Sequence, residues 1–138
     1  MILGIGTDLT NINRLTKVLE KHGDRFINRC FGKVEREKVE KSAKGDFQAR
    51  ASGYAKRWAA KEACAKALGL GIQKGVYLKD MVVVSGDNGE PALQLSGGAK
   101  DRLTALTPKG MTPRIHVSLT DDEPMAMAFV VISAEAKK

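Results

Sequence analysis

The middle of the chain carries five alanines at four-residue spacing: Ala51, Ala55, Ala59, Ala63 and Ala67. This spacing places small side chains on one face of an α-helix. Asp46 and Gly69 are residues that favour the start and the end of a helix, so we expect this helix to cover residues 47–68. A face made of alanine lets another backbone pack tightly against the helix.

Shorter elements are expected on both sides of this helix. Apolar or alternating segments predict strands over residues 2–8, 81–84, 92–95, 114–119 and 125–132. Helices are expected to about residue 21 after a cap at Thr10 or Asn11, from residue 24, over 34–42 and over 99–106. The last strand is apolar on both faces, which is typical of a central strand. These elements predict a single domain over residues 1–138 of the α+β class, with helices packed on one face of a mainly antiparallel sheet.

The composition indicates what kind of molecule this protein binds. The chain has 138 residues, 43% of them hydrophobic, and a formal net charge of +7, which predicts a polyanionic partner. Aromatic residues make up only 5%, which is low for a protein that stacks single-stranded nucleic acid. Cys30 and Cys64 have no metal-site spacing and suit a reducing cytoplasm. We expect neither a signal peptide nor a membrane helix, because the first apolar run stops at Asp8 and no run approaches about 20 residues.

Two acidic residues are candidates for chemistry. Glu62 and Lys66 lie one helical turn apart, a spacing that is typical of an ordinary surface ion pair but also of a site. Asp8 ends an apolar strand, where an aspartate either caps the next helix or binds a metal. If Asp8 and Glu62 converged, they would form an all-oxygen site of the kind that suits Mg²⁺ together with substrate phosphates.

Other residues allow two interpretations. His116 lies on the strand face opposite to Ile115 and Val117, where it is either structural or directed at a ligand. A basic stripe is spaced by three or four residues and is either a solvated face or a docking face for an acidic partner. Its members are Arg14, Lys17, Lys21, Arg25 and Arg29.

These segments together resemble one family, the bacterial holo-[acyl-carrier-protein] synthases, which are small 4′-phosphopantetheinyl transferases. The first motif of that family is GxGTDIVEIxRI, and residues 4–15 read GIGTDLTNINRL. Its signature is RFAAKEAxxKALGTGI, and residues 57–72 read RWAAKEACAKALGLGI. A turn at 88–91 and the segment IHVSLTDD at 115–122 follow in the expected order.

The resemblance implies a cytoplasmic transferase of fatty acid biosynthesis with the 4′-phosphopantetheinyl transferase fold. It would move the phosphopantetheine arm of coenzyme A to a serine of apo-acyl carrier protein and release adenosine 3′,5′-bisphosphate. Asp8 and Glu62 would hold Mg²⁺, and Lys66 would contact the same phosphates. The other residues that would contact coenzyme A are Arg57, Gly69, Asn88, Pro91 and His116. The basic stripe would dock the carrier protein.

The family is trimeric with each site between two subunits, so His116 or the turn at Asn88 would serve a neighbour's site. The general base would be Glu62 or a metal-bound water. The sequence departs from the family at Asn11, where glutamate is usual, at Trp58 and at Leu70. The alternatives are a non-enzymatic nucleic-acid-binding domain, for which a recognition helix and aromatic platforms are lacking, and a basic adaptor for an acidic protein.

Overall fold

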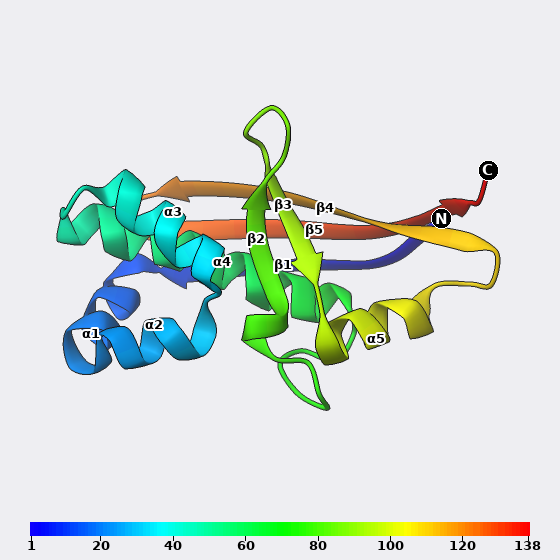
Figure 1. Ribbon diagram of the computed structural model, residues 1–138, viewed down its shortest axis with the longest axis horizontal. Helices are drawn as coiled ribbons and strands as arrows, with labels where there is room; N and C mark the ends of the chain where they lie inside the picture. The colour runs from blue at the N-terminus through cyan, green and yellow to red at the C-terminus, as the bar shows by residue number, and fades with distance from the viewer.

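Three long strands form the larger of two antiparallel sheets in the computed structural model, which describes residues 1–138 (Figure 1). Strands β1 (Ile2–Asn11) and β4 (Met111–Asp122) flank β5 (Met125–Ala136), so the order is β1-β5-β4. This order confirms the prediction that the last strand is central. A separate hairpin of β2 (Met81–Ser85) and β3 (Pro91–Leu95) runs across the direction of the long strands.

One face of the three-stranded sheet is covered by helices. The helices are α1 (Ile12–His22), α2 (Asp24–Cys30), α3 (Lys33–Ala43), α4 (Phe47–Ala67), α5 (Gly97–Leu106) and a short 3₁₀ helix, η1 (Leu78–Asp80). The longest, α4, packs on β1 and β5. The Asp46 carboxylate caps α4 by accepting a hydrogen bond from the Ala49 amide at 3.0 Å, as the sequence predicts. Asn11 caps α1 in the same way through the Asn13 amide.

The contact between β1 and α4 is a backbone-to-backbone contact. Gly4 and Gly6 face the helix at Ala67 and Ala63, the last two members of the alanine series. A Cβ atom on Gly6 would overlap the Ala63 carbonyl oxygen and lie 2.8 Å from the Ala67 nitrogen. The strand can therefore approach the helix only because neither surface carries bulk, which confirms the close packing expected from the alanines.

The opposite face of the sheet carries exposed apolar side chains. Ile5 and Leu9 of β1 are 62% and 63% exposed, and Phe129 of β5 is 44% exposed. In register, Leu9 lies opposite Met127, and Thr7 lies opposite Phe129. No helix of this chain covers these residues, so the sheet presents an apolar surface to the outside.

The expected elements are all present, but the strands are longer than predicted. The strand expected over 114–119 begins at Met111 and ends at Asp122, because it pairs with β5 along its whole length. Its alternation is confirmed, since His116 and Ser118 are exposed while Ile115 and Val117 are partly buried. None of the helices is both long enough and apolar enough to cross a membrane.

We predict that Gly6→Ala lowers the free energy of unfolding by about 3 kcal/mol or more, because the new methyl group must push β1 away from α4. Urea denaturation measures this change. Gly32→Ala is the matched control, since a Cβ there would meet only side-chain atoms, of Val82 at 3.4 Å and of Glu35 at 3.8 Å. Equal stability of the two variants would contradict the account of this contact.

Candidate active site

Close packing of β1 on α4 brings Asp8 to the side of the helix that carries Lys66. The Lys66 Nζ atom lies 3.3 Å from the Asp8 Oδ1 atom and donates a hydrogen bond of 2.9 Å to the Thr7 carbonyl. The Thr10 hydroxyl donates to the other carboxylate oxygen of Asp8 at 2.6 Å. The Asp8 side chain is only 15% exposed, so these two donors fix a partly buried carboxylate in place.

Glu62 lies one turn before Lys66 and is half-buried. Burial raises the pKa of the Glu62 carboxyl, the nearby negative charge of Asp8 raises the pKa further, and Lys66 opposes both effects. Glu62 takes part in none of the ion pairs of the chain. Lys66 therefore pairs with Asp8 rather than with Glu62, and the simple surface pair that the spacing allowed is not formed.

A cation between Asp8 and Glu62 would be favourable, because it would offset the repulsion between the two carboxylates. Asp8 and Glu62 offer only oxygen donors, and no cluster of three or more His, Cys, Asp or Glu side chains is found in the chain. A hard cation held here would need its remaining ligands from a substrate or from water. Mg²⁺ binds in this manner, through one or two carboxylates together with substrate phosphates. The residues present thus fit Mg²⁺ and do not fit a structural zinc site.

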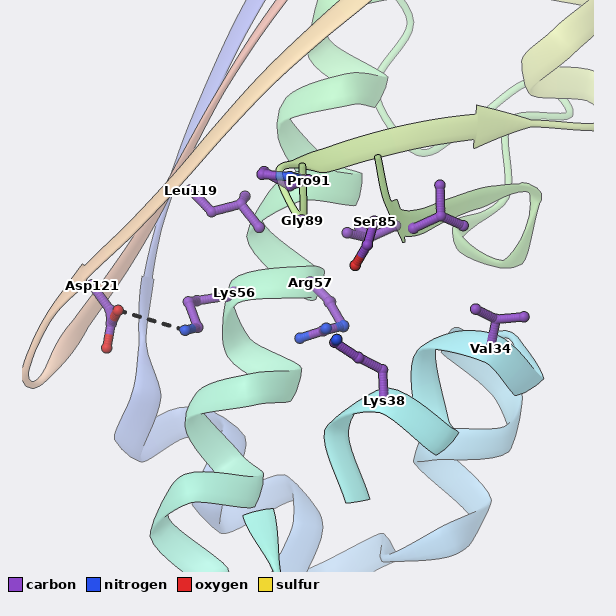
Figure 2. A pocket seen from close by; sticks show the side chains of 11 residues that line it. Val34, Lys38, Lys56, Arg57, Ser85, Gly89, Pro91, Leu119 and Asp121 are labelled. Carbon is purple, nitrogen blue, oxygen red and sulfur yellow. Dashed lines mark ion pairs between the residues drawn. The ribbon is translucent and has the colours of Figure 1, made fainter. Parts of the chain in front are cut away.

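A cavity of about 450 Å³ lies on another side of α4 (Figure 2). Lys38 of α3 and Arg57 of α4 point toward one another across it. The Arg57 Nε atom is buried without a hydrogen-bond partner. Burial also lowers the pKa of the Arg57 guanidinium, opposed by the charge of Glu35. The Arg57 Nη1 atom donates to the Gly53 carbonyl at 3.1 Å, but neither Lys38 nor Arg57 takes part in any ion pair of the chain. The cavity is therefore suited to an anionic ligand.

The remaining lining of this cavity comes from the hairpin and from β4. Gly89 and Pro91 lie at its upper edge in Figure 2, and Lys56 forms an ion pair of 3.6 Å with Asp121 at its rim. Lys38 and Lys56 were not singled out in the sequence, because an isolated lysine on a helix carries no periodic signal. The approach of α3 to α4 makes Lys38 a neighbour of Arg57, whereas Lys56 directly precedes Arg57 on α4.

The acidic pair of Asp8 and Glu62 and the cavity of Arg57 lie on different sides of α4. Arg57 and Glu62 are five residues apart, which rotates their directions by about 140° around the helix axis. The cavity of Arg57 includes residues of β4, whereas Glu62 is next to β1, and β5 lies between these two strands. One chain therefore does not unite Arg57 with the pair of Asp8 and Glu62.

The other predicted site residues lie apart within one chain. His116 is exposed on the open face of the sheet and hydrogen-bonds with the Ser133 hydroxyl at 3.1 Å. Asn88 is exposed at the tip of the hairpin, where its backbone N–H donates to the Glu90 carboxylate. Gly69 follows the end of α4 with a φ of +86°, a conformation that favours glycine. The structure thus places Pro91 with Arg57, and it leaves His116 and Asn88 outside that cavity.

The basic stripe is exposed but divided between two helices. Gly23, with a φ of +50°, separates α1 from α2, so the spacing does not continue as a single helix face. All five basic side chains are exposed. His22, Arg25, Phe26 and Arg29 line a shallow hollow of about 270 Å³. Strand β1, which carries Asp8, leads directly into α1, so the stripe begins shortly after Asp8 in the sequence.

Comparisons with known proteins agree on one family. The sequence profile of the 4′-phosphopantetheinyl transferase superfamily matches residues 4–128. The holo-[acyl-carrier-protein] synthase of Nitrobacter winogradskyi is 57% identical over 99% of this chain and 97% of its own length. The crystal structure of the Neisseria meningitidis holo-[acyl-carrier-protein] synthase has a TM-score of 0.76 at 32% identity, covering 96% of this chain and 99% of that one. The Bacillus anthracis synthase, crystallised in complex with coenzyme A (3′,5′-ADP), has a TM-score of 0.72 at 35% identity, covering 96% of each chain.

We predict that Asp8→Asn lowers the pKa of Glu62 in the metal-free protein, because the neutral amide removes a like charge that disfavours the ionised carboxyl. A carboxyl-detected NMR titration measures this pKa. Asp121→Asn is the control, since Asp121 is paired with Lys56 at the other cavity and should leave Glu62 unchanged. A pKa of Glu62 that does not respond to Asp8→Asn would show that the two carboxylates do not share one site.

Proposed function

This chain belongs to the 4′-phosphopantetheinyl transferase superfamily, and we propose that it transfers the phosphopantetheine arm of coenzyme A to a serine of apo-acyl carrier protein. The serine oxygen forms a bond to the β-phosphorus of coenzyme A, and the bond to the bridging oxygen breaks. Adenosine 3′,5′-bisphosphate leaves with the electron pair, and the serine proton passes to a base. The observation that carries this proposal is the electrostatic coupling of Asp8 with Glu62 beside Lys66.

Asp8 and Glu62 would hold a Mg²⁺ ion, which would neutralise charge on the diphosphate as it builds up. Lys66 adds a fixed positive charge beside the same oxygens, since its ammonium is already held by Asp8 and the Thr7 carbonyl. The serine proton would pass to Glu62 or to a water that Glu62 orients. Positioning and electrostatics supply the catalysis, as is usual in phosphoryl transfer.

The cavity at Arg57 would receive the nucleotide part of coenzyme A. Its two converging cations, Lys38 and Arg57, suit a phosphate such as the 3′-phosphate, and Pro91 provides an apolar wall. Its volume of about 450 Å³ is in the range of nucleotide-sized pockets. Gly69, with no side chain after the end of α4, leaves room for the arm.

We propose further that the protein is a homotrimer with each site shared by two chains. The pair of Asp8 and Glu62 and the cavity of Arg57 lie on different sides of α4, so a neighbouring copy is needed to bring them together. The exposed apolar face around Ile5 and Phe129 is the surface that copies would bury against one another. His116, which lies on that same face, would then enter a neighbour's site.

The exposed basic residues of α1 and α2 would dock the carrier protein. The stripe of Arg14, Lys17, Lys21, Arg25 and Arg29 is suited to an acidic protein surface, and charge complementarity speeds the encounter. The half-buried Phe26 lies in the hollow between Arg25 and Arg29 and offers an apolar contact. We place the reaction in the cytoplasm, where the free thiols of Cys30 and Cys64 would stay reduced.

The proposed function is tested by incubating the protein with coenzyme A, Mg²⁺ and apo-acyl carrier protein. We expect the carrier to gain the mass of phosphopantetheine, EDTA to stop the reaction and added Mg²⁺ to restore it. Glu62→Gln should lower kcat by at least about 100-fold. Its melting temperature should be unchanged or higher, because a carboxyl with a raised pKa costs stability once it is ionised above that pKa. No mass gain with a competent carrier would favour a binding role, and full activity of Glu62→Gln would remove that residue from the site.

Docking is tested separately by reversing two charges of the stripe. Arg14→Glu combined with Arg25→Glu should raise KM for the carrier about tenfold or more, because like charges oppose the encounter. The Kd for coenzyme A should stay the same. The matched control reverses Lys100 of α5 and Lys109 of the loop that follows α5, which are also exposed. Helix α5 lies far from α1 and α2 in Figure 1. Equal loss of affinity for both substrates, or an equal effect of the control, would show that the stripe is not the docking face.

A further inference from the structure

A buried ion pair lies directly beside the candidate site. Lys61 of α4 and Glu35 of α3 are both 0% exposed, and the Lys61 Nζ atom lies 2.7 Å from the Glu35 Oε1 atom. Lys61 immediately precedes Glu62 and lies one turn after Arg57. The mechanism proposed above does not use either residue, although a buried charged pair is costly to desolvate.

Every polar side-chain atom of Lys61 and Glu35 has a hydrogen-bond partner. The Lys61 ammonium also donates to the carbonyl oxygens of Leu78, at 3.0 Å, and of Met81. The Glu35 carboxylate also accepts from the Gly32 amide at 3.0 Å and from the Val83 amide at 3.1 Å. Lysine has three donors, and all three are satisfied here. The two side chains therefore connect α3, α4, η1 and β2 through a single network without an unpaired group.

Three of the connected elements, α3, α4 and β2, line the cavity. Val34, the neighbour of Glu35, and Lys38, one turn later, face the cavity from α3. Val83, whose amide is bound by Glu35, faces it from β2. Arg57 lies on the same side of α4 as Lys61, and the charge of Glu35 acts on it electrostatically. The network thus sets how far α3 and the hairpin stand from the helix that carries Arg57.

A gain in folding stability does not by itself explain why a buried ion pair is present here. Apolar residues of similar volume often replace a buried ion pair with no loss of stability, and sometimes with a gain. A hydrogen-bonded pair differs from apolar packing because it fixes distances and directions between the elements it joins. Lys38 and Arg57 come from two of those elements, and Pro91 comes from β3, where it pairs with Ser85 of β2. The mutual spacing of these three residues therefore depends on this connection.

We propose that Glu35 and Lys61 are positioning residues that hold α3 and the β2–β3 hairpin at the distance from α4 that the nucleotide of coenzyme A requires. The inference rests on the proposed function, because it takes the cavity to be the nucleotide site. Neither residue needs to touch the substrate. Their effect is on the affinity of the cavity and not on the reaction at Glu62.

The test is the double variant Glu35→Leu with Lys61→Met, which replaces the pair by apolar groups of similar size. We expect a melting temperature within a few degrees of the unmodified protein. The Kd for adenosine 3′,5′-bisphosphate and the KM for coenzyme A should rise about tenfold or more, because altered spacing of Lys38 and Arg57 weakens their hydrogen bonds to a phosphate. The kcat should fall much less, because neither Glu35 nor Lys61 touches the reacting atoms. The control variant replaces the exposed pair of Lys33 and Glu37 on α3 by Met and Leu, and it should bind the nucleotide normally.

Three results would overturn the inference. A folded double variant that binds adenosine 3′,5′-bisphosphate as well as the unmodified protein would show that the pair is only structural. If the double variant does not fold, Glu35→Asp is measured instead, because this change keeps the negative charge but shortens the side chain by one methylene. Normal nucleotide binding by Glu35→Asp would also show that the pair is only structural. Failure of the unmodified protein to bind the nucleotide would remove the proposed function itself, and the inference with it.

Discussion

The packing of strand β1 directly on helix α4 is the contact on which the rest of the structure depends. Gly6 faces Ala63 so closely that a single added methyl group would overlap the helix backbone. This approach places Asp8 at the edge of α4, where its charge acts on Glu62 and its carboxylate pairs with Lys66. A bulkier residue on either surface would separate the strand from the helix, and it would thereby move Asp8 away from Glu62. Small residues here therefore serve the chemistry as well as the fold.

Helix α4 carries two kinds of chemistry on two of its sides. Toward β1 it presents Glu62 and Lys66, and toward α3 and the hairpin it presents Arg57. A rigid helix fixes the distance between these groups but cannot turn them toward one another. The exposed apolar face of the sheet offers a way to bring these groups together. Copies that bury Ile5 and Phe129 against one another would place the Glu62 side of one α4 helix near the Arg57 side of another.

Much of the fold could be predicted from local sequence. The alanine series, the cap at Asp46 and the alternation around His116 each depend on neighbours within a few residues, and all three are confirmed. The ends of β4 could not be predicted, because they are set by pairing with β5. The approach of Lys38 to Arg57 and the burial of Lys61 depend on contacts between distant segments. Convergence of Asp8 with Glu62 followed from the family resemblance, since their separation in the sequence gives no local signal.

In the proposed trimer, a complete active site combines Glu62 of one chain with Arg57 of another. The direct measurement is subunit complementation: chains carrying Glu62→Gln are mixed with chains carrying Arg57→Ala under conditions that exchange subunits. Each variant alone should be almost inactive. In random mixed assemblies about a quarter of the sites would hold both intact residues, so about a quarter of the activity should return. If mixing restores no activity although subunits exchange, each site lies within one chain, and the claim is wrong.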